Sequence, residues 1–408
     1  MLLQMKNNQY IEFYSQVKDT IAQRSCTLMN AHREEALRVF SEQGFPSKKV
    51  ERYRYTDVAQ DFAPDYGIQL STSAAERTEF CCSVREADID LTPYYYNNIA
   101  DRQDSIVALN TMLAVDALLV HVPRNTRAKH PIQINNVLKG KQDTMVNRRI
   151  LVIMEEGSQA DIIITDHAVD HQQFLTNQVI EVHCAENSHL NLYEIEETNL
   201  MCTRYSNVFI REGRDCSVRH TVLTLFNGHT RNACRVEMAG ENSEAILNGC
   251  VIADKMQRVD NNTIIRHMVP NCQSQELYKY VLDDSAMGAF AGMILVDKGA
   301  QKTSSSMTNA NLCSTRQARM FTQPMLEIYA DDVKCSHGST VGQMNDQALF
   351  YMRQRGISLS EARLLLKSAF ITEVIDSIPL EALRDRLHLI VDKRMRGELS
   401  KCEGCKLC

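Results

Sequence analysis

The sequence predicts a mainly β fold, a β-solenoid flanked by α-helical regions at both ends. Three observations lead to this prediction. Apolar residues follow helical spacing in roughly the first 60 residues, a turn-then-strand unit recurs through the middle of the 408-residue chain, and helical spacing returns after about residue 343. No long helical pattern separates the middle strands, so a doubly wound α/β fold is not expected. A β-sandwich would give similar strands, but with less reason for a regular repeat.

The N-terminal region reads as helix followed by a link. The first helix face is formed by apolar residues at regular spacing: Ile11, Tyr14, Val17 and Ile21. A second apolar run over residues 36–40 ends at Gly44, which we expect to adopt the left-handed conformation of a helix C-cap, and Pro46 prevents continuation. Residues 60–100 show no clear period. We therefore assign residues 1–100 to an N-terminal helical domain and link.

The middle region consists of polar turns that are each followed by alternating apolar residues. Four copies align when they are counted from Gly157, Asn187, Gly213 and Asn242, with steps of 30, 26 and 29 residues. Each unit is too small to bury its own apolar face, so neighbouring units must stack. This pattern favours a β-solenoid core over residues 101–342.

The C-terminal region, residues 343–399, is predicted to be helical again. Ser358 and Glu361 have the spacing of a capping box, and an apolar helix face follows. Ser377 is expected to cap the next helix, with Pro379 opening it, and Gly397 marks its end. Residues 400–408 form a short polar tail that contains three cysteines.

Composition narrows the function class. The formal net charge of −6 argues against a protein that binds nucleic acid or an anionic membrane, because both need a positive surface. No apolar leader follows Met1, and apolar stretches such as residues 113–122 are too short to span a bilayer. The 14 cysteines are irregularly spaced, which is typical of free thiols in a reducing compartment. We therefore expect a cytoplasmic protein.

Several strings of the sequence resemble one known family. Residues 324–342 read PMLEIYADDVKCSHGSTVG, which resembles the signature of the SufB/SufD family in its SufD form. Residues 347–357, QALFYMRQRGI, are similar to the stretch that follows it, and residues 290–294, 307–312, 44–46 and 53–57 also resemble family segments. SufB carries a glutamate-rich string where this chain has residues 334–340, which favours the SufD form. Tyr53 departs from the tryptophan that is frequent in the family.

This resemblance implies a fold, partners and a role. The implied core is a right-handed parallel β-helix between helical domains. The implied partners are a SufB-like paralogue and a SufC-like ATPase, which would bind the C-terminal helical domain. The implied ATPase contacts are Phe350, Tyr351, Arg355, Gly356, Ile357 and Phe370. ATP chemistry would belong to the partner, and this chain has no phosphate-binding loop of the Gly-x-x-x-x-Gly-Lys type. The expected role is a non-enzymatic scaffold for iron–sulfur cluster assembly.

Cys335 and His337 are the candidate cluster-assembly residues. Residues two apart on a strand point to the same face, so a thiolate and an imidazole would lie together as ligands for iron. The spacing alone favours a buried cysteine beside a hydrogen-bonded histidine. The resemblance implies instead that both residues serve cluster building at the SufB interface. Two ligands cannot complete a site, so the expected cofactor is a transient iron–sulfur cluster or iron shared with SufB. The sequence leaves open whether a reduced flavin, suggested for complexes of this family, also binds the complex.

Other interpretations of the sequence remain open. The tail residues Cys402, Cys405 and Cys408 have a spacing that suits one metal or cluster, or they belong to a solvated tail with adventitious metal affinity. In the first case the chain alone would act as a metal or thiol carrier. A β-solenoid enzyme that acts on a carbohydrate or acyl substrate is another alternative, although the acidic pairs at 283–284 and 331–332 point to opposite strand faces. Exposed strand edges would also permit a homodimer.

Overall fold

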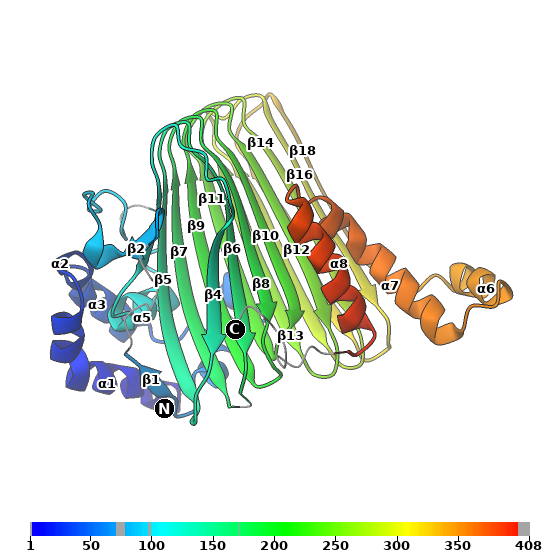
Figure 1. The fold of residues 1–408 in the computed structure, drawn as a ribbon, viewed down its shortest axis with the longest axis horizontal. Coiled ribbons are helices and arrows are strands. Elements are labelled where there is room, and N and C mark those ends of the chain that lie inside the picture. The colour runs from blue at the N-terminus through cyan, green and yellow to red at the C-terminus, as the bar shows by residue number, and fades with distance from the viewer. Residues whose placement is uncertain (1, 71–77, 97–98, 171, 399–408) are drawn as a thin grey trace.

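The computed structural model describes residues 2–70, 78–96, 99–170 and 172–398 of the chain. Two sheets of mostly parallel strands form a β-solenoid, with helices at both ends, as predicted (Figure 1). The ten-stranded sheet contains β1 (Gly67–Gln69), β2 (Cys81–Ser83), β3 (Leu118–Val122), β5 (Thr144–Met154), β7 (Phe174–Cys184), β9 (Cys202–Glu212), β11 (His229–Met238), β13 (Arg258–His267), β15 (Met287–Val296) and β17 (Arg319–Ile328). The eight-stranded sheet contains β4 (Ile132–Leu138), β6 (Gln159–Ala168), β8 (His189–Glu197), β10 (Ser217–Phe226), β12 (Glu244–Ala253), β14 (Gln273–Leu282), β16 (Thr303–Cys313) and β18 (Val333–Gly342).

Each turn of the solenoid contributes one strand to each sheet, and equivalent strands of successive turns pair in parallel. The interior is filled by apolar side chains that stack in columns along the solenoid. One column in the ten-stranded sheet runs through Val152, Val182, Ile210, Val236, Ile265, Ile294 and Leu326. Most members of this column are almost fully buried. Stacking of this kind lets each short unit bury its apolar face against the next.

A residue with positive φ occupies the corner between the two sheets in every turn except the last, between β17 and β18. The corner residues include Gly157, Asn187, Asp215, Asn242 and Asn271. The predicted alignment was therefore wrong in its third copy, because Asp215 and not Gly213 is equivalent to Asn187. The register confirms this, since His189 pairs with Ser217. Asp and Asn tolerate the left-handed conformation better than other side chains, so glycine is not required at this corner.

The N-terminal helices pack against the outer face of the ten-stranded sheet. They are α1 (Leu2–Arg24), α2 (Thr27–Asn30), α3 (Arg33–Gln43), α4 (Val58–Asp61) and α5 (Ser105–Leu113), with 3₁₀ turns η1 (Glu51–Tyr53) and η2 (Val84–Glu86). Helix α5 lies within the range assigned to the core, and every residue in it is buried. Asp104 caps it by accepting from the amides of Ile106 and Val107. Gly44 ends α3 with a positive φ of 61°, as expected, but its ψ of −158° lies outside the left-handed helical region.

The C-terminal helices are α6 (Asp346–Gln354), α7 (Leu359–Asp376) and α8 (Glu381–Met395). Helices α7 and α8 lie against the outer face of the eight-stranded sheet, whereas α6 extends away from the solenoid (Figure 1). Ser358 caps α7 by accepting from the amide of Glu361, as predicted. The predicted role of Ser377 was wrong: it is the C-cap of α7, and its hydroxyl donates to the carbonyl of Val374. Helix α8 starts later, after Leu380.

Charged side chains hold α7 and α8 on the solenoid. Arg394 donates to the carbonyl oxygen of Leu225 at 2.7 Å and pairs with Asp254 at 2.8 Å. Lys367 on α7 pairs with Asp283, just after β14. Among the described residues, no helix combines the length and apolar character needed to cross a membrane.

Candidate functional site

Cys335 and His337 lie on β18, which is the outermost strand of its sheet. Their neighbours in the register are Ser305 and Met307, both buried side chains of β16. Paired residues of parallel strands point to the same side of a sheet. Cys335 and His337 therefore face the interior side together, at the open end of the solenoid, as the spacing predicted.

The two side chains differ in their exposure. Cys335 is partly buried and packs against the solenoid core, whereas His337 is exposed. Burial raises the pKa of the Cys335 thiol, and a hydrogen bond from the backbone of Ser305 partly opposes this effect. Cys335 is thus a neutral thiol at pH 7, and a metal ion would have to displace its proton.

Hydroxyl groups continue inward from Cys335. The Ser305 hydroxyl lies 2.6 Å from the Ser274 hydroxyl, which lies 2.9 Å from Nε2 of His267. Burial lowers the pKa of His267 to about 4, so this imidazole is neutral at pH 7. Within the described residues, no group of three or more His, Cys, Asp or Glu side chains is arranged to hold a metal ion. Cys335 and His337 accordingly offer two ligands and need others from elsewhere.

The open end of the solenoid exposes strand edges and apolar side chains. No described strand pairs with the outer edges of β17 and β18. Met320 and Leu326 on β17 are only partly buried, and Tyr329 just beyond β17 is 62% exposed. An edge of this kind is a template for pairing with another chain.

The residues predicted to contact an ATPase fall into two groups. Phe350 and Tyr351 on the projecting helix α6 are 64% and 60% exposed, and the Arg355 guanidinium donates to the Tyr351 hydroxyl at 3.0 Å. Gly356 ends this segment with φ of 85°, a conformation that favours glycine, and Ile357 follows it. Phe370 lies apart from them on α7.

Phe370 packs within the molecule. It is partly buried against the cluster between α7 and the eight-stranded sheet. The ammonium group of Lys279 lies 4.7 Å from the centre of its ring and donates to its backbone carbonyl at 3.0 Å. The tail residues Cys402, Cys405 and Cys408 lie outside the described residues.

Sequence reasoning missed a charged network inside the solenoid. Asp166 pairs with both Arg148 and Arg204, and Arg204 also pairs with Glu194. Nε2 of His220 lies 2.9 Å from Glu194. Burial opposes ionisation of Glu194, but Arg204 and the hydrogen bond with His220 outweigh it and lower the pKa to about 2. The sequence does contain a signal for this network, because these charged residues occupy the inward-facing positions of their strands.

Glu276 on β14 is a buried carboxyl that is neutral at pH 7. Burial raises its pKa to about 8, although the hydroxyl of Thr263 donates to it at 2.7 Å. The unfolded chain releases this proton near the ordinary pKa of 4.5. The folded state therefore binds more protons between about pH 4.5 and 8, so the free energy of unfolding is expected to fall as the pH rises through this window.

We predict that Glu276→Gln removes this loss of stability, because the amide oxygen still accepts from Thr263 and cannot ionise. Chemical denaturation from pH 5 to 9 should show that the free energy of unfolding of the variant exceeds that of the wild type by an amount that grows as the pH rises. The gain at pH 9 should reach several kcal/mol, at about 1.4 kcal/mol per unit of pKa shift. The exposed Glu244→Gln serves as the control. A difference from wild type that stays constant with pH would contradict the assignment.

Two models of known protein families match this chain. The family model described as the SufBD core domain of SUF system FeS cluster assembly matches residues 136–370. A second model, described as the N-terminal region of SufBD proteins, matches residues 4–94 and 81–134.

Individual relatives carry related descriptions. The iron–sulfur cluster assembly protein SufD of Escherichia coli is 29% identical over 292 residues, which are 71% of this chain and 69% of the relative. An iron–sulfur cluster assembly SufBD family protein of Synechocystis is 27% identical over 395 residues, with 86% and 87% covered. The SufD protein of Bacillus subtilis is 22% identical over 322 residues, with 78% and 74% covered.

Proposed function

The chain belongs to the SufBD family of the iron–sulfur cluster assembly system, and we propose that it acts there as a SufD-like scaffold subunit and not as an enzyme. The observation that carries this proposal is the pair Cys335 and His337 on the last strand of the solenoid. A thiol and an imidazole face the same side at an open, partly apolar end. Such a site is incomplete alone and suits a cluster that is built between two subunits in the cytoplasm.

The partner at this end is proposed to be a SufB-like paralogue. The outer edges of β17 and β18, unpaired among the described strands, offer backbone groups for association, and Met320 and Leu326 offer apolar contact. Iron and sulfide are the cargo of this interface. Cys335 would bind iron through sulfur after losing its proton, and the exposed His337, on the same side of β18, would offer an imidazole nitrogen. The partner must supply the remaining ligands.

A SufC-like ATPase is the second proposed partner, and α6 is its proposed docking element. This helix extends away from the solenoid and presents Phe350 and Tyr351 to solvent. Exposed aromatic residues beside an arginine are typical of residues that dominate binding energy at interfaces. Phe370 has a different proposed part, because its packing against Lys279 positions α7 and with it the base of α6.

A β-solenoid enzyme has less support. Asp283, one of the acids considered for such an activity, pairs with Lys367 and holds α7 on the sheet. Asp331 and Asp332 are exposed in the turn between β17 and β18, so the expectation that they lie on a strand was wrong.

A test of the scaffold role compares complex formation with enzymatic activity. We expect the purified chain to capture the SufC-like ATPase and the SufB-like paralogue when the three are co-expressed. A chain that bound neither, and released sugar or acyl products from model substrates, would overturn the proposal.

The cysteine-containing tail separates the scaffold from a stand-alone metal carrier. We predict that deletion of residues 400–408 leaves the melting temperature within a few degrees, because so short and polar a segment carries too little apolar surface to stabilise the fold. Differential scanning calorimetry and metal analysis of both chains test this. Tight iron or zinc retention that disappears together with the tail would favour the carrier.

A further inference from the structure

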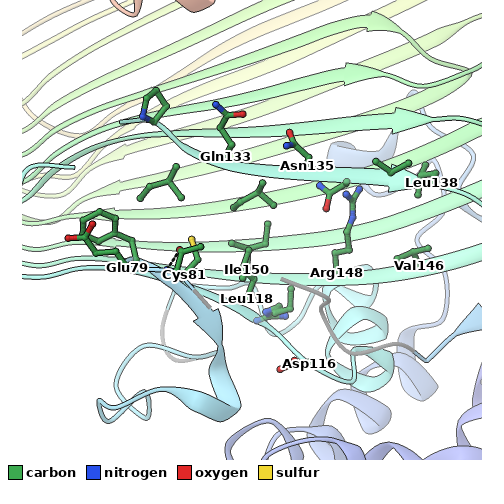
Figure 2. Close-up of a pocket in the computed structure, with 18 of the residues that line it drawn as sticks. Glu79, Cys81, Asp116, Leu118, Gln133, Asn135, Leu138, Val146, Arg148 and Ile150 are labelled. Carbon is green, nitrogen blue, oxygen red and sulfur yellow. Dashed lines mark hydrogen bonds between the residues drawn. The ribbon is translucent and has the colours of Figure 1, made fainter. Parts of the chain in front are cut away.

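The two ends of the ten-stranded sheet are covered differently. At the first turn, β2 pairs with β3 in the antiparallel direction, so a strand of the same chain covers the edge of β3. Figure 2 shows this end, where Cys81 on β2 lies beside a cavity that is also lined by Leu118 on β3 and Ile150 on β5. At the last turn, no strand within the described residues pairs with the outer edge of β17. The edge of β17 is therefore a place where another chain can extend this sheet.

A segment of the N-terminal domain, residues 51–57, contacts the outer face of the ten-stranded sheet, and we call it the strap. The guanidinium carbon of Arg231 on β11 lies 4.3 Å from the centre of the Tyr53 ring. The hydroxyl of Thr56 donates to the carboxylate of Asp260 on β13 at 2.6 Å. Arg231 and Asp260 are neighbours in the register of the sheet. The strap is thus held on two adjacent strands by buried contacts.

The strap also reaches the terminal strand β17. The ring of Tyr55 stacks on Phe321, with 5.1 Å between the ring centres and 21° between the ring planes. Phe321 faces outward, since its neighbour Met320 packs against the solenoid core. Gln323 on the same strand donates to the Glu51 carboxylate at 3.0 Å. The strap and β17 therefore form one continuous surface at the free edge of the sheet.

This surface has an apolar part that the chain leaves open to solvent. Phe321 is 37% exposed, and Tyr55 and Met325 are each partly exposed. Met325 faces the same side of β17 as Phe321, because residues an even number apart on a strand point the same way. Aromatic and methionine side chains are enriched at the centre of protein–protein interfaces. Their position beside an unpaired strand edge is typical of a contact with another chain.

A strand added at the edge of β17 would place its side chains next to this surface. Side chains that are opposite each other on paired strands lie about 5 Å apart. The outward-facing side chains of the added strand would therefore contact Phe321 and Tyr55, and the inward-facing ones would continue the solenoid interior beyond Leu326. Cys335 and His337 lie on β18 at the same end of the solenoid. The chain that pairs with β17 is thus the one placed to complete their site.

We propose that Tyr55 and Phe321 form an anchoring patch for the SufB-like partner, whose terminal strand extends the ten-stranded sheet at β17. This proposal rests on the scaffold role proposed above. It gives the N-terminal domain a part in binding the partner, because Tyr55 belongs to the strap and not to the solenoid. The added strand presents apolar side chains to the patch on its outward-facing side.

Photo-crosslinking of the complex co-expressed with both partners tests this placement. Tyr55 is replaced by the photoreactive amino acid p-benzoyl-L-phenylalanine, and the exposed Leu389 on α8 is replaced in the same way as the control. We expect irradiation to join position 55, but not position 389, to the SufB-like partner, as identified by mass spectrometry. Copurification of that partner without a crosslink from position 55, or a crosslink to a second copy of this chain, would overturn the patch and leave the scaffold role standing. Absence of the partner from the purified complex would contradict both.

Affinity variants measure how much the patch contributes. Tyr55→Ala should weaken binding of the purified SufB-like partner at least about 10-fold in biolayer interferometry, because aromatic anchors dominate binding energy at interfaces. Tyr55→Phe keeps the ring and should bind within about 2-fold of the wild type. Leu389→Ala is the control for loss of an exposed apolar side chain, and circular dichroism checks folding. Phe321→Ala provides the same test if Tyr55→Ala does not fold. Unchanged affinity in the folded variant, or an equal loss in Leu389→Ala, would contradict the proposal.

Discussion

Cells that depend on this chain for iron–sulfur cluster assembly are expected to lose most of that capacity when Cys335→Ser and His337→Ala are combined. Cys335→Ser nearly preserves side-chain volume but removes the soft ligand, and His337→Ala removes the imidazole. The fold should persist, because His337 is exposed and Cys335 is only partly buried at the end of the core. The measurement is complementation of a deletion strain under iron limitation.

Of the two single variants, His337→Ala should have the larger effect. A thiol of the partner subunit can take the place of Cys335, whereas no other histidine lies near residue 337 in the sequence. Ser339→Ala is a suitable control, because it changes the same strand two residues further on without removing a metal ligand. Full complementation by the double variant would contradict the assignment of Cys335 and His337 to cluster assembly, but it would not contradict the scaffold role.

The second large effect is expected at α6. Phe350→Asp combined with Arg355→Glu should reduce capture of the SufC-like ATPase at least about 10-fold, because it removes an exposed aromatic residue and reverses a charge on the projecting helix. The solenoid should keep its melting temperature, since α6 extends away from it. Pull-down with a tagged ATPase, with circular dichroism in parallel, provides the measurement.

Phe370→Asp distinguishes docking from positioning. Its ring packs against the sheet and Lys279, so this variant should both weaken capture and lower the stability of the C-terminal helices. Leu389→Asp, at an exposed position of α8, is the matched control for an added surface charge.

Normal capture by the Phe350→Asp and Arg355→Glu double variant would place the ATPase interface elsewhere on the chain.

Local sequence signals predicted the solenoid because its repeat is short and each unit contacts its neighbour. Cys335 and His337 were predicted to share one side of a strand for an equally local reason, since residues two apart point the same way in any strand. The third copy was misaligned because glycine was taken as the corner residue, while Asp215 adopts the left-handed conformation there. The alignment used Gly and Asn as corner residues and overlooked Asp, which also tolerates the left-handed conformation.

The sequence did not predict which side chains pair across the interior of the solenoid. Alternation indicates which residues of a strand face inward, but it does not pair Arg204 with Asp166 and Glu194 across the interior. Two buried nitrogens of Arg148 have no partner among the described residues, which is visible only in the structure. The packing of Phe370 could not be predicted for a similar reason. An apolar helix face can pack against a partner or against the protein's own sheet, and the helical period does not distinguish the two.

The most direct test of the account is cluster formation on the purified complex of this chain with its SufB-like and SufC-like partners. Wild-type and Cys335→Ser/His337→Ala complexes are supplied with iron, sulfide donor and ATP, and cluster content is followed by visible absorbance and acid-labile sulfide. We expect that both complexes assemble with the same composition and that the variant forms little or no cluster. A variant complex that accumulates cluster at the wild-type rate and yield would contradict it.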